Sequence, residues 1–260
     1  MSRIARAFAS GKAFIPFITG GDPDLATTEM LVDALVGAGA DVIEIGVPFS
    51  DPIAEGPVIE AADQRALGAG CTTVRLLETV ARIRERVDVP LILMTYYNPV
   101  FFRGVDRFVA EAAAAGVDGL IVPDLPFEER DELHWPCATA GLDLISMIAP
   151  TSKARIGHIA RHSTGFLYCV SSLGVTGERD DLGNAARSMI ARVRETSDIP
   201  CAVGFGVSTP DQAREVVTYA DGVIVGSAIV RIIAEHGRDA AGPVHRYAAS
   251  IKEAIRKETS

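Results

Sequence analysis

Eight short runs of almost continuously apolar residues recur along the chain, and they constrain its fold more than any other feature of the sequence. A half-exposed strand alternates apolar and polar side chains, whereas a parallel strand covered on both faces is apolar throughout. The runs therefore predict buried parallel strands, at residues 14–19, 41–47, 90–96, 119–124, 143–149, 165–171, 201–207 and 222–228. Amphipathic segments between them predict helices, as at residues 27–40, 73–87, 106–117 and 209–220.

A similar punctuation precedes several of these runs, in which an Ala or Gly helix end is followed by Asp, as in GADVIEI, GVDGLIV, GLDLISM and YADGVIV. This is weak internal repetition of one strand–helix unit. Eight such units in 260 residues match the strand number and size of a (β/α)8 barrel. A doubly wound sheet is the alternative, but it usually has fewer strands. The sequence predicts an α/β fold, a single (β/α)8 TIM barrel domain over residues 1–260.

The composition excludes several classes of protein. With 34 acidic and 25 basic residues the formal net charge is −9, and no basic stripe indicates a nucleic-acid partner. Four cysteines without a C-x-x-C pair favour reduced, buried thiols, at Cys71, Cys137, Cys169 and Cys201. No apolar run reaches the roughly 20 residues of a membrane helix, and the first residues lack the apolar stretch of a signal peptide. We expect a cytoplasmic protein without a membrane partner.

Glycines at the ends of the last two predicted strands indicate a phosphate site. In a barrel the active groups lie at the carboxyl ends of the strands, and phosphate usually binds after the seventh and eighth. The ends GFGVS and VGSAIV provide Gly206, Gly226 and Ser227, whose backbone N–H groups could approach an anion at a helix N-terminus. Gly177, in the polar segment after the sixth strand, could close over the same group. The alternative is that these glycines only turn the chain.

Other kinds of chemistry lack suitable residues. A Schiff-base mechanism needs a lysine near a strand end, but the four lysines lie outside the strands, and only Lys153 follows one closely. His158 and His162 share a helix face, yet mid-helix positions belong to the outer ring of a barrel, so we expect no metal site. The nicotinamide fingerprint lacks its third glycine. Carboxylates are the remaining candidates for the catalytic groups.

Two glutamates surround the second predicted strand end, in EIGVPFSDPIAEGP. Glu44 lies between Ile43 and Ile45, and side chains alternate in direction along a strand, so Glu44 points into the barrel mouth if the isoleucines face the helices. Glu55 follows a Pro-punctuated turn that can bring its carboxylate over the same opening. Two carboxylates in one desolvated pocket could divide acid and base work. The alternatives are a structurally paired Glu44 and a solvated Glu55.

Aromatic residues gather near the predicted ends of strands one, three, six and seven, at Phe17, Tyr96, Tyr168 and Phe205. Each could simply fill the strand interior. Together they suggest a flat pocket beside the phosphate site, which fits a ligand with an apolar ring at one end and a phosphate at the other.

Several segments, in the same order over essentially the whole chain, resemble the tryptophan synthase alpha chain family: FITGGDPD, EIGVPFSDP, MTYYNPV, VPDLP, VSSLGVTG, GFGVS and GSAIV. EIGVPFSDP and GVTG are specific to that family. The resemblance implies a (β/α)8 barrel of tryptophan biosynthesis that cleaves indole-3-glycerol phosphate to indole and glyceraldehyde 3-phosphate. This is a retro-aldol reaction that needs no cofactor. It also implies a beta-chain partner that depends on pyridoxal phosphate, in an alpha2beta2 heterotetramer.

By the same resemblance, Glu44 matches the family's catalytic glutamate, which would protonate indole C3 and take the proton of the side-chain hydroxyl. Glu55 falls where the family has an aspartate that binds the indole N–H, which is a departure. One extra methylene moves the carboxylate, and a misplacement of about 1 Å can cost on the order of 10²-fold in rate.

The remaining positions that match the family bind substrate or partner. The indole pocket would comprise Phe17, Tyr96, Tyr168, Thr176 and Phe205. The phosphate would bind at Gly177, Gly206, Gly226 and Ser227. Asp51 and Pro52 match segments that face the beta chain. Two alternatives stay open because of Glu55: a stand-alone lyase that releases free indole, and a weakly catalytic barrel that binds a phosphorylated ligand and activates a partner chain.

Overall fold

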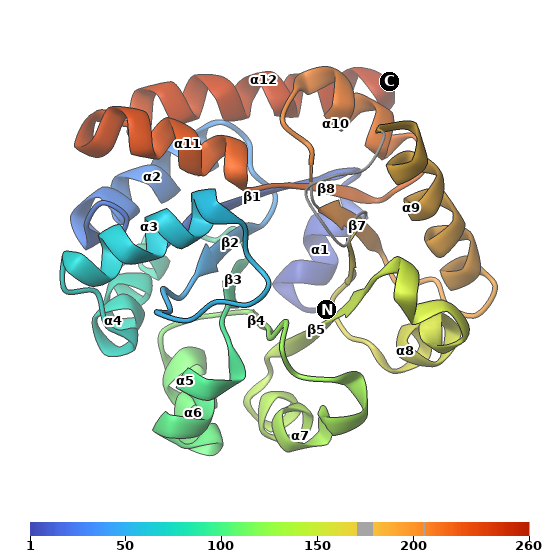
Figure 1. The fold of residues 1–260 in the computed structure, drawn as a ribbon, viewed down its shortest axis with the longest axis horizontal. Coiled ribbons are helices and arrows are strands. Elements are labelled where there is room, and N and C mark those ends of the chain that lie inside the picture. Colours follow the sequence, from blue (N-terminus) through green and yellow to red (C-terminus); the bar gives the residue numbers. More distant parts are fainter. Residues whose placement is uncertain (171–178, 205, 260) are drawn as a thin grey trace.

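The computed structural model describes residues 1–170, 179–204 and 206–259, with the backbone alone for 179–183, 258 and 259. Parallel strands form a closed barrel in chain order, each paired with its sequence neighbours and the last with the first (Figure 1). The predicted (β/α)8 barrel is therefore confirmed. Its strands are β1 (Ala13–Thr19), β2 (Ile43–Gly46), β3 (Leu91–Met94), β4 (Gly119–Ile121), β5 (Asp143–Ile148), β6 (Leu167–Val170), β7 (Cys201–Gly204) and β8 (Gly222–Val225).

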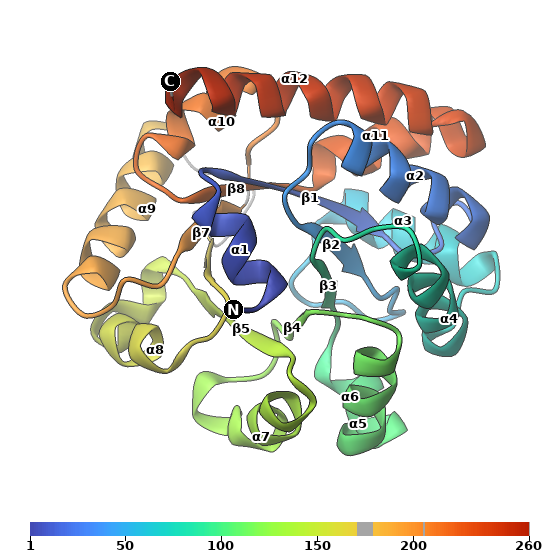
Figure 2. The ribbon, with the colours of Figure 1, turned by 180° about the vertical axis from the view of Figure 1, so that it is seen from behind.

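Helices form a ring outside the barrel, and α12 spans one side of it, behind α10 and α11 in Figure 1 and in front of them in Figure 2. The ring comprises α2 (Leu25–Gly37), α3 (Pro57–Gly68), α4 (Thr73–Arg84), α5 (Tyr97–Arg103), α6 (Val105–Ala114), α7 (Asp131–Ala140), α8 (Ile156–His162), α9 (Arg179–Arg194), α10 (Pro210–Val217), α11 (Ser227–His236) and α12 (Ala241–Thr259). Short 3-10 turns accompany them, η1 (Phe127–Glu129), η2 (Pro150–Arg155) and η3 (Gly237–Asp239).

The remaining helix, α1 (Arg3–Ala9), lies at the end of the barrel where the strands begin, facing the viewer in Figure 2. Its Ile4 is fully buried and belongs to the same apolar cluster as interior strand residues such as Ile15. Phe8 packs on Phe166, with ring centroids 5.3 Å apart. The amino end of the barrel is thus plugged by side chains, which leaves the carboxyl end for chemistry.

Two apolar layers hold the strands in place. Ile43 and Ile45 belong to the larger layer, which packs the barrel against helix residues such as Leu31 and Leu76. The inner layer fills the barrel and includes Ile92, the register partner of Glu44. Full burial of each such side chain contributes about 1.5–3 kcal/mol. The expectation that Ile43 and Ile45 face the helices is confirmed, and Glu44 faces the other way.

Local chemistry sets where the helices begin. At α10 the Thr209 hydroxyl accepts the Gln212 N–H at 3.3 Å, and the Gln212 side chain accepts the Thr209 N–H at 3.2 Å, which is a capping box followed by Pro210. Asp24 caps α2 by accepting the Thr27 N–H at 2.8 Å. Each side chain satisfies an N–H that has no partner inside its own helix.

Three Asp residues that precede strands have a shared structural role. Asp41 accepts the Phe14 N–H of β1 at 2.7 Å, Asp118 the Leu91 N–H of β3 at 2.9 Å, and Asp221 the Cys201 N–H of β7 at 2.8 Å. Each carboxylate thus ties the start of one strand to its neighbour. Each also pairs with a cation from an outer helix, which keeps its charge compensated: Lys252, Arg84 and Arg194, respectively.

Several boundaries differ from those expected. All strands except β1 are shorter than predicted, and β3 ends at Met94, so Tyr96 is the N-cap of α5. The long segment after β2 contains α3 as well as the expected α4. His162 is the last residue of the short α8, and both His158 and His162 are exposed. All four cysteines are free and buried, as expected.

Some large apolar side chains remain exposed. Ile53 is 80% exposed, Phe101 66% and Phe102 93%, and they lie after the carboxyl ends of the neighbouring strands β2 and β3. Trp135, the one tryptophan of the chain, is 63% exposed on α7. Among the described residues, no helix is both long and apolar enough to cross a membrane.

Candidate active site at the carboxyl end of the barrel

Glu44 is the most unusual residue at the carboxyl end of the barrel. Its side chain is fully buried, and in the described part of the chain neither carboxylate oxygen has a hydrogen-bond partner. Burial, with a further contribution from the negative charge of Glu55, raises the pKa of Glu44 from 4.5 to about 8. A buried carboxyl without a cation is stable only when neutral, so Glu44 holds a proton at neutral pH.

Glu55 lies at the same opening but is held differently. Its Oε2 accepts the Tyr96 hydroxyl at 2.7 Å, and the Tyr96 oxygen in turn accepts the N–H groups of Ile53 and Ala54 at 3.0 and 2.8 Å. Burial raises the pKa of Glu55, and the hydrogen bond from Tyr96 opposes that rise. Glu55 is thus a fixed, partly buried carboxylate and not a freely solvated loop charge.

Asp63 of α3 is a third carboxylate near this opening, and the sequence pattern did not single it out. It is 4% exposed and accepts the Phe49 N–H. Burial and the charge of Glu55 raise its pKa to about 7. The one available signal was its position between Ala62 and Ala66 on the buried face of the helix. Asp63 fixes the backbone at the start of the segment that carries Glu55.

Aromatic side chains line the opening. Phe17 pairs in register with Glu44 and packs against Ala62 and Val230. Tyr168 is buried on β6, and burial together with the charge of Glu44 raises its pKa. The ring of Tyr96 lies 5.3 Å from that of Phe49.

Two glycines that the sequence pattern did not identify allow these rings to fit. A Cβ at Gly204 would lie 2.5 Å from the Tyr168 hydroxyl oxygen, and one at Gly46 would lie 2.7 Å from the Phe17 ring. Contacts this short do not occur, so any side chain there would displace the ring. The sequence does not indicate which aromatic ring packs against a single glycine in an apolar strand.

The predicted phosphate residues lie at the ends of β7 and β8. Gly226 is the N-cap of α11, and its carbonyl accepts the N–H groups of Ile229 and Val230 at 2.8 and 3.1 Å. The N–H groups of Ser227 and Ala228 therefore have no carbonyl partner within α11 and lie at the positive end of its dipole. Gly206 has a φ of +84°, a conformation that favours glycine, and is exposed.

Other predicted residues lie at the periphery or outside the described structure. Asp51 is exposed and Pro52 half-buried, in the segment that leads to Glu55. Thr176, Gly177 and Phe205 lie outside the described residues.

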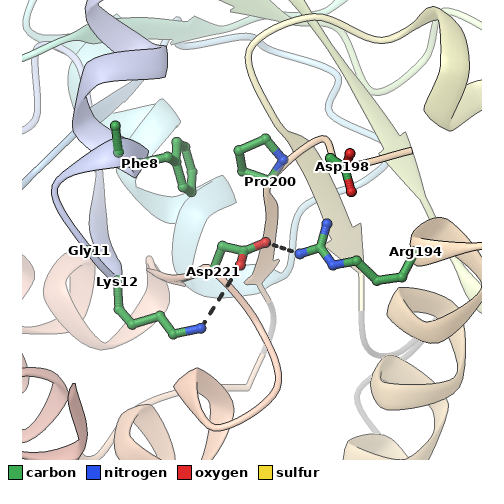
Figure 3. Close-up of a pocket in the computed structure, with 8 residues that line it drawn as sticks. Phe8, Gly11, Lys12, Arg194, Asp198, Pro200 and Asp221 are labelled. Carbon is green, nitrogen blue, oxygen red and sulfur yellow. Dashed lines mark hydrogen bonds and ion pairs between the residues drawn. The ribbon is translucent and has the colours of Figure 1, made fainter. Parts of the chain in front are cut away.

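A cavity of about 420 Å³ lies at the opposite end of the barrel, among residues that precede β1, β7 and β8 (Figure 3). Three of its charged groups pair with one another, since Asp221 lies between Arg194 and Lys12, with 3.9 Å between Lys12 Nζ and Asp221 Oδ1. Residues at the amino end of a barrel stabilise the fold, whereas active sites lie at the carboxyl end. This cavity is therefore not the candidate active site.

Comparison with known proteins agrees with the geometry. The family model described as "Tryptophan synthase alpha chain" matches residues 5–259. The chain belongs to the tryptophan synthase alpha chain family. It is accordingly a catalytic subunit of the lyase type in tryptophan biosynthesis.

Relatives within the tryptophan synthase alpha chain family match along nearly their whole length. The alpha chain of Geobacter sulfurreducens is 48% identical over 98% of this chain and 99% of its own. That of a Picosynechococcus strain is 49% identical over 98% of this chain and 100% of its own.

Solved structures of family members share the fold. The alpha subunit from Legionella pneumophila superposes with a TM-score of 0.90 at 37% identity, covering 99% of both chains. A structure of the alpha2beta2 complex from Pyrococcus furiosus contains a chain with a TM-score of 0.87 at 37% identity, covering 94% of this chain and 99% of that one.

Proposed function

We propose that this chain cleaves indole-3-glycerol phosphate to indole and glyceraldehyde 3-phosphate, with Glu44 and Glu55 as the catalytic carboxylates. The observation that carries the proposal is the burial of Glu44 without a partner in the described part of the chain. A structural glutamate at such a position would be paired, because an unpaired buried carboxyl destabilises the fold. Belonging to the family supports the same reaction.

Glu44 has the proton affinity that the reaction needs. With a pKa of about 8 it is neutral at neutral pH and can give its proton to indole C3. The resulting carboxylate then takes the proton of the side-chain hydroxyl next to the breaking C–C bond, as that bond's electrons return to the ring. Glu44 ends neutral, and one proton has moved from oxygen to carbon. A general acid/base works best when its pKa lies near the working pH.

Glu55 complements this step at the other end of the ring. Protonation at C3 places positive charge on the indole nitrogen, and a carboxylate near the N–H stabilises that charge in a pocket of low dielectric. Tyr96 binds Glu55 Oε2, and in the described part of the chain no hydrogen bond reaches Oε1. Oε1 is therefore available to accept the indole N–H, while Phe17 and Tyr168 contact the ring faces.

The substrate phosphate would bind at Gly206 and at the start of α11, through the N–H groups of Ser227 and Ala228. An exposed helix N-terminus favours an anion both by hydrogen bonds and by its dipole. No cofactor takes part in the reaction.

The partner would be a tryptophan synthase beta chain in an alpha2beta2 heterotetramer, working in the cytoplasm. The exposed apolar side chains of Ile53, Phe101 and Phe102 support this, since they lie with Asp51 and Pro52 around one end of the barrel. Exposed apolar clusters on soluble proteins mark interaction surfaces.

Glu44→Gln is the test of the proposed reaction. The amide has the shape of the acid but cannot cycle a proton, so cleavage of indole-3-glycerol phosphate should fall by about 10²-fold or more, while glycerol 3-phosphate still binds. Steady-state assays of the isolated chain and of its mixture with a beta chain measure this. A Glu44→Gln variant within about tenfold of the unmodified chain would remove Glu44 from the reaction.

A further inference from the structure

The hydroxyl of Tyr96 connects Glu55 to the backbone that carries it. It donates to Glu55 Oε2 at 2.7 Å and accepts from the Ile53 and Ala54 N–H groups at 2.8–3.0 Å. Tyr96 itself cannot easily move, because it is 3% exposed and its ring packs on Phe49. It also belongs to a different strand–helix unit, as the N-cap of α5.

These contacts determine the position of the carboxylate. Glu55 lies in an irregular segment between β2 and α3, and a glutamate side chain has three rotatable bonds. The Tyr96 oxygen already accepts two backbone N–H groups, and the single hydrogen of the hydroxyl is donated in a hydrogen bond to Glu55. Oε2 is held by this bond, so Oε1 is turned away from the tyrosine.

We propose that Tyr96 is a positioning residue of the site, whose hydroxyl orients Glu55 so that one carboxylate oxygen is presented to the N–H of a bound indole ring. The proposal rests on the proposed function for the identity of the substrate. It assigns to Tyr96 a polar task in addition to its contribution to the aromatic wall, and the hydroxyl touches no reacting atom.

Tyr96→Phe removes the hydroxyl and keeps the ring. Because the substrate's phosphate binds elsewhere, KM should change by less than about threefold, while kcat for cleavage should fall by about tenfold or more, the size that misplacement of a reacting group produces. Tyr97→Phe is a matched control, since the Tyr97 hydroxyl also donates to a glutamate, Glu132, on the outside of the barrel. It should leave both constants unchanged.

A double-mutant cycle separates positioning from other effects of the hydroxyl. In a Glu55→Ala background nothing is left to position, so adding Tyr96→Phe should cause no further loss. If Tyr96→Phe lowers kcat equally with and without the Glu55 carboxylate, the hydroxyl does not act through Glu55 and the proposal is overturned.

A readout without substrate keeps this test independent of the proposed reaction. The hydrogen bond from Tyr96 lowers the pKa of Glu55, so its loss should raise that pKa. Carboxyl ¹³C NMR titration of the full chain should show the rise in Tyr96→Phe and not in Tyr97→Phe. An unchanged Glu55 titration would refute the positioning role even if the cleavage assay succeeds. A chain that fails to cleave indole-3-glycerol phosphate but shows the rise would instead refute only the proposed function.

Discussion

At the scale of single residues, the site depends on three carboxyl groups that the fold treats differently. Glu44 is buried without a partner in the described part of the chain, Glu55 is held by a tyrosine, and Asp63 binds a backbone N–H. Burial raises the pKa of all three, to about 8 for Glu44 and to about 7 for Asp63. Their hydrogen-bond partners differ, so the three carboxyl groups can serve as acid, charge partner and structural acceptor in one small space.

The raised pKa of Glu44 predicts a pH-dependent stability. The pKa is 4.5 in the unfolded chain and about 8 in the folded one, so the folded chain binds the proton more tightly. Stability is then fully present below pH 4.5 and is lost as pH rises through 8. Glu44→Gln lacks this loss. Urea unfolding at about pH 5 and about pH 9 measures this. From the lower to the higher pH, the unfolding free energy of the variant should rise relative to that of the unmodified chain by up to a few kcal/mol, since one pKa unit corresponds to about 1.4 kcal/mol.

The comparison needs only the two proteins at two pH values and constant ionic strength. A difference in unfolding free energy that stays the same at both would mean that Glu44 is charged in the folded chain. The acid step would then have no proton donor at this position.

At the scale of elements, an Asp that bridges two strands and an outer helix recurs at the amino end of the barrel, whereas the carboxyl end carries the groups that would bind ligands. Asp41, Asp118 and Asp221 each join the start of one strand to the next and to an outer helix. The first N–H groups of α11 have no such partner within their helix. Stability and binding are thus carried by opposite ends of the same strands.

Asp118→Ala should test the first role. The change leaves the Leu91 N–H unpaired and Arg84, whose side chain is 14% exposed, without its carboxylate. Removal of one partner of a buried ion pair costs about 3–5 kcal/mol in unfolding free energy. Asp88→Ala is the control, because Asp88 pairs with Arg3 from a side chain that is 82% exposed. Urea unfolding should show a large loss of unfolding free energy for Asp118→Ala and nearly none for Asp88→Ala. Equal losses would contradict the structural role of Asp118.

Ser227→Asp should test the second role. A carboxylate in the first turn of α11 stabilises the helix dipole by about 0.3–1 kcal/mol, yet it repels a phosphate at the same place. Calorimetric titration with glycerol 3-phosphate should show a Kd raised by about tenfold or more, with the melting temperature maintained. Ser227→Asn has a similar size without the charge and should bind within a fewfold of the unmodified chain. Equal binding by both variants would place the phosphate elsewhere.

At the scale of the whole molecule, the sequence predicts the barrel better than it predicts the site. Continuous apolar runs determine which segments are covered on both faces, and that is a property of each segment by itself. The direction of the Glu44 side chain could be predicted for the same reason, because Ile43 and Ile45 beside it face the helices. The bond between Tyr96 and Glu55 and the fit of Gly204 under Tyr168 join separate strand–helix units, and the contact of Asp63 with Phe49 depends on the path of the segment between β2 and α3. Such contacts depend on register and loop path, which no single segment encodes.

The exposed side chains around α5 predict association. Phe102→Asp should weaken binding of a beta chain, because it puts a charge into an apolar contact. The isolated chain should keep its melting temperature, since Phe102 is 93% exposed. Met30→Asp, at a 44% exposed residue of α2 on another side of the ring, is the control (Figure 1). Sedimentation of each variant mixed with a beta chain measures association, and equal binding by both would move the interface away from α5.

The exposed position of Trp135 has a consequence for the cell that makes this protein. The chain serves the supply of tryptophan but needs only one such residue per copy, and that residue lies at the surface of α7, mostly in contact with water. When tryptophan runs short, ribosomes stall or insert a wrong amino acid at tryptophan codons. The Trp135 ring packs on the His134 ring, with centroids 5.0 Å apart. Such a pair contributes about 0.5–1.5 kcal/mol, so a wrong amino acid at this codon should lower the stability of the barrel only slightly. We therefore expect a barrel that carries such an error still to fold, at the moment when the pathway is needed most.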